Sequence, residues 1–208
     1  MELIDYLSES FFTEQQLLAR GGIDLARLRD WQTRRLMPQA SYRLRLTVDC
    51  ESVFGPHSAE GQLRYYAKAY VDWIAELLAS EEEVCERFCA RYRQRLIERG
   101  AQGLRTGASQ FNAGLEQHLV QEWSAFLHGT YGLCARAGLP EDIADKELSS
   151  AIVKETIEGE QVLTVAERER LRVAVDLLDR SCAPFAPHER ARSSRRRLVD
   201  EVRATHLA

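Results

Sequence analysis

The sequence is short of the features that usually reveal a protein's chemistry. Its five cysteines are odd in number, widely spaced and without a CxxC pair, which argues against a disulfide framework and against a zinc site. No apolar run approaches the ~20 residues that cross a bilayer, and no early basic segment leads into an apolar one. We therefore expect no membrane segment, no secretion signal, no metal and no cofactor, and we expect a cytoplasmic protein.

Composition and charge describe an ordinary folded protein. Hydrophobic residues make up 45% and charged residues 29% of the chain, values that exclude wholesale disorder. The net charge of -4 and the pI near 5.8 argue against a surface wholly committed to nucleic acid or anionic lipid. Any contact of that kind must be local.

The segment 12–46 carries the clearest structural pattern. Thr13 and Gln16 form a capping-box pair at the start of one helix, and Asp24 can cap a second helix after a Gly-Gly turn. Pro38 ends the second helix, and alternating apolar residues then predict a short strand. This order of helix, turn, basic helix and strand predicts a winged helix-turn-helix.

Beyond the strand expected over 42–48, residues 49–58 are expected to form a connector, and the remaining patterns are helical. Capping residues, prolines and glycines predict helices over about 58–79, 80–99, 110–128, from 140 onward, 164–180 and 188–205. The predicted fold is therefore mainly α, with an N-terminal winged helix-turn-helix module over residues 1–50 packed on a larger helical body over residues 51–208.

The N-terminal module resembles the DNA-binding half of the MerR family. The resemblance lies in LRDWQTRRLMP at 28–38 and SYRL at 41–44. It implies that Arg29 is a DNA-contacting arginine and that Arg43 belongs to the wing. Asp30 departs from the family pattern, where an aromatic residue is usual, and its carboxylate would repel a phosphate backbone.

Charge is unevenly shared between the module and the body. Residues 12–45 hold seven arginines against three carboxylates, so the module is about +4 and the remainder about -8. This asymmetry permits a local phosphate-binding face, but a solvated surface beside an acidic body would also show seven arginines on short helices. The residues expected to bind a partner or nucleic acid are Arg27, Arg29, Arg34, Arg35 and Arg43.

Three further segments resemble a small bacterial family of about this length that is labelled as natural-product biosynthesis proteins. They are FGPHS at 54–58, the stretch at 122–147 and FAPHERARSSRRRLVDEVR at 185–203. The resemblance implies an accessory or biosynthetic protein of bacterial specialised metabolism and transfers no site residue.

No catalytic motif is recognisable, but a few residues are candidates for an enzyme site in the body. His118 and Glu122 lie four apart on one helix face, a spacing that suits an oriented base or two metal ligands. Tyr131 lies in the turn-like segment HGTYGLC, and His188 lies near the C-terminal arginines. The alternative interpretation is a simple His–Glu contact, with Tyr131 packed on the body.

Three functions of different classes remain open. The leading hypothesis is a recognition or accessory protein that docks through its winged helix. The alternatives are a MerR-like transcriptional regulator with a helical sensor body, and a small biosynthetic enzyme. We expect a protein or small-molecule partner, do not favour nucleic acid, expect no membrane contact, and leave the oligomeric state open.

Overall fold

The computed structural model describes residues 2–158 and 163–207, and this part of the chain is mainly helical, as predicted. Its first half contains α1 (Glu2–Ser10), β1 (Phe11–Thr13), α2 (Glu14–Gly21), α3 (Leu25–Thr33), β2 (Tyr42–Ser52), β3 (Gly55–Ala67) and α4 (Tyr70–Ala79). Its second half contains α5 (Val84–Ala101), α6 (Leu115–Leu127), α7 (Thr130–Cys134), α8 (Pro140–Ile157), α9 (Val165–Ser181) and α10 (Glu201–His206).

Local capping explains where several helices begin. Thr13 with Gln16 and Thr164 with Glu167 both form complete capping boxes, so the predicted starts of α2 and α9 are confirmed. The Asp24 carboxylate accepts a hydrogen bond from the backbone N–H of Arg27 at 2.7 Å and caps α3. These side chains satisfy backbone donors that would otherwise lack partners.

The largest difference from the prediction lies between residues 49 and 70. The expected connector over 49–58 and the helix expected from residue 58 are both wrong, because β2 and β3 form one long antiparallel hairpin and α4 begins only at Tyr70. Apolar and polar residues do alternate along β3, but its alanine, glutamate and glutamine are good helix formers and hide that pattern.

Smaller differences follow from local backbone geometry. Ser80 and Glu83 form no capping box, because Glu83 adopts a left-handed conformation at φ 48° and α5 starts after it. The helix expected over 110–128 is divided into a 3-10 turn (Ser109–Phe111) and α6. The last expected helix is also interrupted, since the Ser193 hydroxyl binds the backbone at Arg190 and Arg196.

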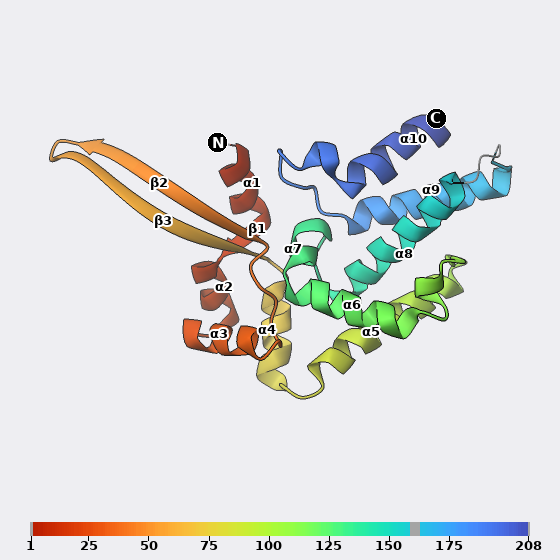
Figure 1. Ribbon diagram of the computed structural model, residues 1–208, viewed down its shortest axis with the longest axis horizontal. Helices are drawn as coiled ribbons and strands as arrows, with labels where there is room; N and C mark the ends of the chain where they lie inside the picture. Colours follow the sequence, from red (N-terminus) through yellow and green to blue (C-terminus); the bar gives the residue numbers. More distant parts are fainter. Residues whose placement is uncertain (1, 159–162, 208) are drawn as a thin grey trace.

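The three strands form one sheet in the order β1-β3-β2. β1 pairs with β3 only at its base, from Phe11↔Ala67 to Thr13↔Tyr65, whereas β2 pairs with β3 from Tyr42↔Tyr65 to Ser52↔Gly55. The hairpin consequently projects away from the helices (Figure 1). We call its residues 43–64 the arm.

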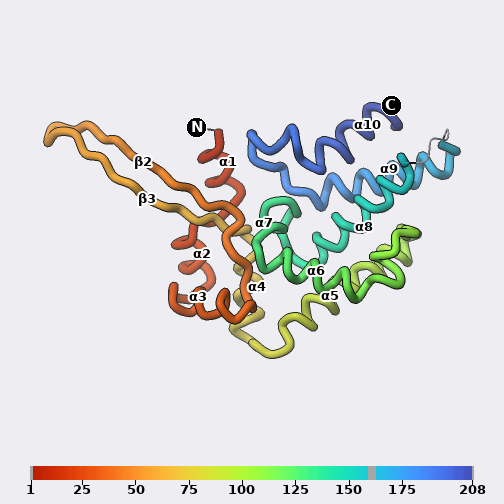
Figure 2. The backbone as a smooth tube through the Cα atoms, viewed as in Figure 1, coloured from red at the N-terminus to blue at the C-terminus, as the bar shows by residue number. Residues whose placement is uncertain are grey.

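Two large apolar clusters hold the helices together. The first joins the N-terminal module to the body, because Leu28 and Trp31 of α3 belong to it together with Trp73, Phe88 and Phe126. The second lies between α8, α9 and α10, which run beside one another (Figure 2). No helix in the described part of the chain is long and apolar enough to cross a bilayer.

Candidate functional site

Helix α3 carries Arg27 and Arg29, and Arg34 follows it directly; each of these three, among the five arginines predicted to bind a partner, forms an ion pair within the chain. Arg29 binds Glu14 of α2 at 2.5 Å. Arg27 lies 2.9 Å from Glu81, and Arg34 lies 2.6 Å from the same carboxylate. The positive charge of α3 is therefore largely balanced by neighbouring carboxylates.

Sequence reasoning did not connect Glu14 and Glu81 with these arginines, nor Asp30, which lies 2.9 Å from Arg34. Burial alone would raise the pKa of Glu14, but its hydrogen bond from Arg29 holds it below the ordinary value. A hydrogen bond from the Trp31 indole N–H at 2.8 Å, together with Arg34, lowers the pKa of Glu81. Both carboxylates are thus ionised at neutral pH. Glu81 follows α4, and no local pattern links it to a helix fifty residues earlier.

The other two candidate arginines are less constrained. Arg35 is exposed with a left-handed backbone at φ 58°. Arg43 is exposed at the base of the arm and makes a 3.5 Å hydrogen bond to Gln39. A groove of about 240 Å³ between α3 and the arm is lined by Arg29, Gln32, Thr33, Gln39, Arg43 and Arg64. Three of the six residues that line this groove are arginines, and none is a carboxylate.

The arm has two different faces. Because opposite residues of an antiparallel pair share a face, Leu44, Leu46 and Val48 lie with Leu63 and Ala59 on an apolar face. The other face carries the alternating charged residues. Every residue from 47 to 63 is exposed, so neither face is covered by the described part of the chain.

The tip of the arm is apolar and fully in solvent. Val53 is 96% and Phe54 97% exposed in the turn between the strands. Two-residue hairpin turns usually contain Asn, Asp or Gly, and here Gly55 at φ 103° supplies the positive φ directly after the turn. A bulky pair at such a position departs from turn preference, as happens where binding rather than folding selects the residues.

The helical body contains a chain of buried polar side chains that includes three of the four candidate catalytic residues. The Tyr92 hydroxyl lies 3.0 Å from Nε2 of His118, and Nδ1 of His118 lies 3.6 Å from Glu122. The Tyr131 hydroxyl donates a hydrogen bond to Glu122 and lies 3.4 Å from Glu147. Lys146 completes the chain with a 2.7 Å ion pair to Glu147. We call these six residues the buried polar chain.

Burial sets the protonation states along the buried polar chain. It raises the pKa of Glu122 to about 7, and the nearby Glu147 carboxylate adds to this effect. It lowers the pKa of His118, which is therefore neutral at physiological pH. Burial would also lower the pKa of Lys146, but Glu147 more than offsets this and keeps the ammonium group charged.

The candidate catalytic residues of the buried polar chain are closed to solvent, and Glu147 near its end is half-buried. His118 and Glu122 are each 7% and Tyr131 is 5% exposed. His188, the fourth catalytic candidate, lies elsewhere, with a half-exposed side chain 3.8 Å from Glu189. In the described part of the chain no group of three or more His, Cys, Asp or Glu side chains could hold a metal ion. These side chains are arranged as a hydrogen-bonded core network.

The segment HGTYGLC forms the short helix α7 rather than an exposed turn. Gly129 has φ 81°, and a Cβ there would meet the Gln39 carbonyl oxygen at 2.6 Å, so this position requires glycine. Gly132 packs closely on Tyr70, where a Cβ would also collide. Burial raises the pKa of Cys134, so this thiol is protonated and unreactive at neutral pH.

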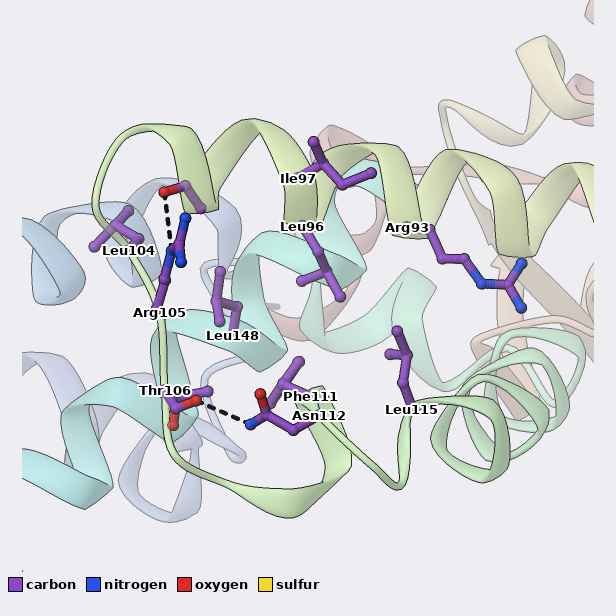
Figure 3. Close-up of a pocket in the computed structure, with 11 residues that line it drawn as sticks. Arg93, Leu96, Ile97, Leu104, Arg105, Thr106, Phe111, Asn112, Leu115 and Leu148 are labelled. Atoms are coloured by element: carbon purple, nitrogen blue, oxygen red, sulfur yellow. Dashed lines mark hydrogen bonds between the residues drawn. The ribbon is translucent and has the colours of Figure 1, made fainter.

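An apolar pocket of about 450 Å³ lies next to the buried polar chain (Figure 3). Leu96 of α5, Phe111 and Leu115 contribute to its wall, and the Phe111 ring packs edge-on against His118 with centroids 5.1 Å apart. Arg93 at its rim is already paired with Glu116 at 2.6 Å. The pocket suits a small apolar molecule, but its lining contains no member of the buried polar chain.

Comparison with known proteins gives a family and no function. No curated protein and no solved structure matches the chain. One family model, described as "Family of unknown function (DUF6058)", matches residues 84–207, which include α5 to α10. Because this match covers more than half of the sequence, the chain belongs to that family.

Proposed function

We propose that the N-terminal part of the chain is a winged helix-turn-helix that serves as a docking module for another protein. Its element order is α1-β1-α2-α3-β2-β3, and β1 joins the outer side of a hairpin that follows the second helix of the pair. That order supports a winged helix in which the arm is an extended wing and α3 occupies the place of the recognition helix.

The single observation that favours protein docking over DNA binding is that the arginines in and directly after α3 are already paired within the chain. A helix that binds DNA needs free cationic side chains for phosphates, and each one neutralised within the protein is lost to that contact. Arg27, Arg29 and Arg34 are all in ion pairs with the chain's own carboxylates. Meanwhile Phe54 at the tip offers the kind of exposed aromatic side chain that anchors protein interfaces.

The cytoplasmic location and the link to specialised metabolism belong to this proposal. All five cysteines are free thiols, which suits a reducing compartment. The link to specialised metabolism rests on the sequence resemblance alone. We do not place catalysis in the body, since the candidate residues that come together there are buried.

A site-specific cross-link tests docking directly. A photoreactive amino acid replaces Phe54 in the full chain in its native host, and the matched control replaces Val120, an exposed residue of α6. We expect a discrete adduct with a different protein from position 54 and none from position 120. The purified partner should then bind the Phe54→Ser variant at least about tenfold more weakly than the parent. An identical adduct pattern at both positions, or no adduct, contradicts the proposal.

The second candidate function is DNA binding, which the groove lined by Arg29, Arg43 and Arg64 favours. Titration with duplex DNA at two salt concentrations separates the two functions. We expect no specific complex tighter than about micromolar at physiological salt, against roughly 10 nM or better for a dedicated regulator. Nanomolar, salt-sensitive binding that Arg43→Ala and Arg29→Ala both weaken would put the regulator first.

A further inference from the structure

Strand β2 is an open edge along its whole length. Its only pairing in the described part of the chain is with β3, so one side of its backbone has no strand partner from Tyr42 to Ser52. On that side α1 lies beside the base of the arm, where Leu44 packs against the apolar cluster of α1, and further out the arm stands clear of the helices (Figure 2). Long open edges pair readily with other chains, and an isolated two-stranded hairpin is only marginally stable in water. Both properties favour the pairing of a further strand with the open edge of β2.

The sequence of β2 indicates which strand could pair with this open edge. Residues 43–51 read RLRLTVDCE, with arginines on one side of Thr47 and carboxylates at the matching distances on the other. Arg45, Asp49 and Glu51 form no ion pair or hydrogen bond through their side chains with the rest of the described chain. We infer that β2 pairs antiparallel with β2 of a second copy of this chain, centred on Thr47.

In this register every opposite position is complementary. Arg43 lies opposite Glu51 of the second copy, and Arg45 lies opposite Asp49 of the second copy, on the polar face. On the apolar face the corresponding pairs are Leu44 with Cys50 and Leu46 with Val48. The two arms become one four-stranded sheet with a continuous apolar face, which meets the size needed for independent stability.

Other registers are less favourable. Centring the pair on Leu46 keeps only the match of Arg43 with Asp49, and centring it on Val48 keeps only that of Arg45 with Glu51. A parallel in-register pair would place arginine on arginine and carboxylate on carboxylate, which is destabilising. Shifts by one residue would put apolar side chains on the polar face. Charge therefore selects the antiparallel pair centred on Thr47.

Charge reversal tests this inference independently of docking. Arg45→Glu and Asp49→Arg each place like charges opposite one another twice per dimer. We expect wild type to sediment at twice its 23.8 kDa mass, and each single variant to dissociate at least about tenfold more readily. The double variant, and an equimolar mixture of the two single variants, should regain the dimer because both restore opposite charges.

A monomeric wild type at about 100 μM, or single variants that dimerise as well as wild type, would overturn the inference. So would a mixture that stays monomeric. The cross-link experiment above can fail while this one succeeds, because it reports a different protein at the tip rather than a second copy at the edge.

Cysteine cross-linking fixes the register. In a Cys50→Ser background, Thr47→Cys places two thiols at directly opposite positions, where Cα atoms about 4.5–5.5 Å apart allow a disulfide. The matched control, Ser52→Cys, is also exposed but lies opposite Tyr42 of the second copy and far from its own counterpart. We expect mild oxidation to give a covalent dimer from Thr47→Cys only. Equal cross-linking at both positions contradicts the register.

Discussion

The arm and the buried polar chain use similar residue types in opposite ways. In the body, Tyr92, His118, Glu122 and Tyr131 are buried and find their partners within the fold. In the arm, the alternating charged residues between Arg43 and Glu60 remain exposed, with no covering element in the described part of the chain. The comparison teaches that a carboxylate beside a histidine, such as Glu122 beside His118, has a structural role when both side chains are buried. Exposed charges of opposite sign without partners in the described chain, such as Arg45 and Asp49, instead indicate a binding surface.

The largest expected effect concerns a buried aromatic residue of the N-terminal module. Trp31 is fully buried in the first apolar cluster and its indole N–H binds Glu81. We expect Trp31→Ala to lower the free energy of unfolding by about 3–5 kcal/mol, because it leaves a large cavity and removes one hydrogen bond to Glu81. Urea denaturation measures this loss. An unchanged midpoint would mean that α3 does not pack on the body.

The next effect tests whether the buried polar chain is a structural network, and it depends on pH. The pKa of Glu122 is about 7 in the fold, against an ordinary value of 4.5. Because the fold holds this proton more tightly than the unfolded chain does, the stabilisation from Glu122 is complete below pH 4.5. It is then lost progressively as pH rises to 7, by about 3 kcal/mol in all.

Glu122→Gln removes this titration while keeping an acceptor for the Tyr131 hydroxyl. We expect the variant to gain stability on wild type by about 2–3 kcal/mol between pH 5 and pH 8, measured by urea unfolding at both values. The comparison of the two proteins cancels the opposite contribution of His118, whose lowered pKa costs stability as pH falls through its ordinary value. Parallel pH profiles for the two proteins would contradict the proposed state of Glu122.

Sequence reasoning succeeded where the signal is local. Capping residues such as Thr13, Asp24 and Thr164 act within one turn of a helix, so they can be identified in the sequence and their helices are confirmed. It failed for β3, because helix-forming residues occupy a strand whose conformation is set by pairing with β2. Of the candidate site, the pairing of His118 with Glu122 follows from helical spacing. Glu81 reaches Trp31, and Glu147 reaches Tyr131, only through the tertiary fold.

The smallest expected effect completes the comparison at the tip of the arm. Phe54 touches solvent on nearly all sides, so Phe54→Ala should change the free energy of unfolding by no more than about 0.5 kcal/mol. Replacing the aromatic Trp31 by alanine should cost several kcal/mol, so the difference in stability between the two variants is due to the different exposure of the two side chains. Phe54 also lies outside the paired residues 43–51, so the variant should keep the mass of wild type in sedimentation. A loss of stability above about 1 kcal/mol would show that the tip packs on the body, and the arm would then be part of the fold rather than a surface held out for a partner.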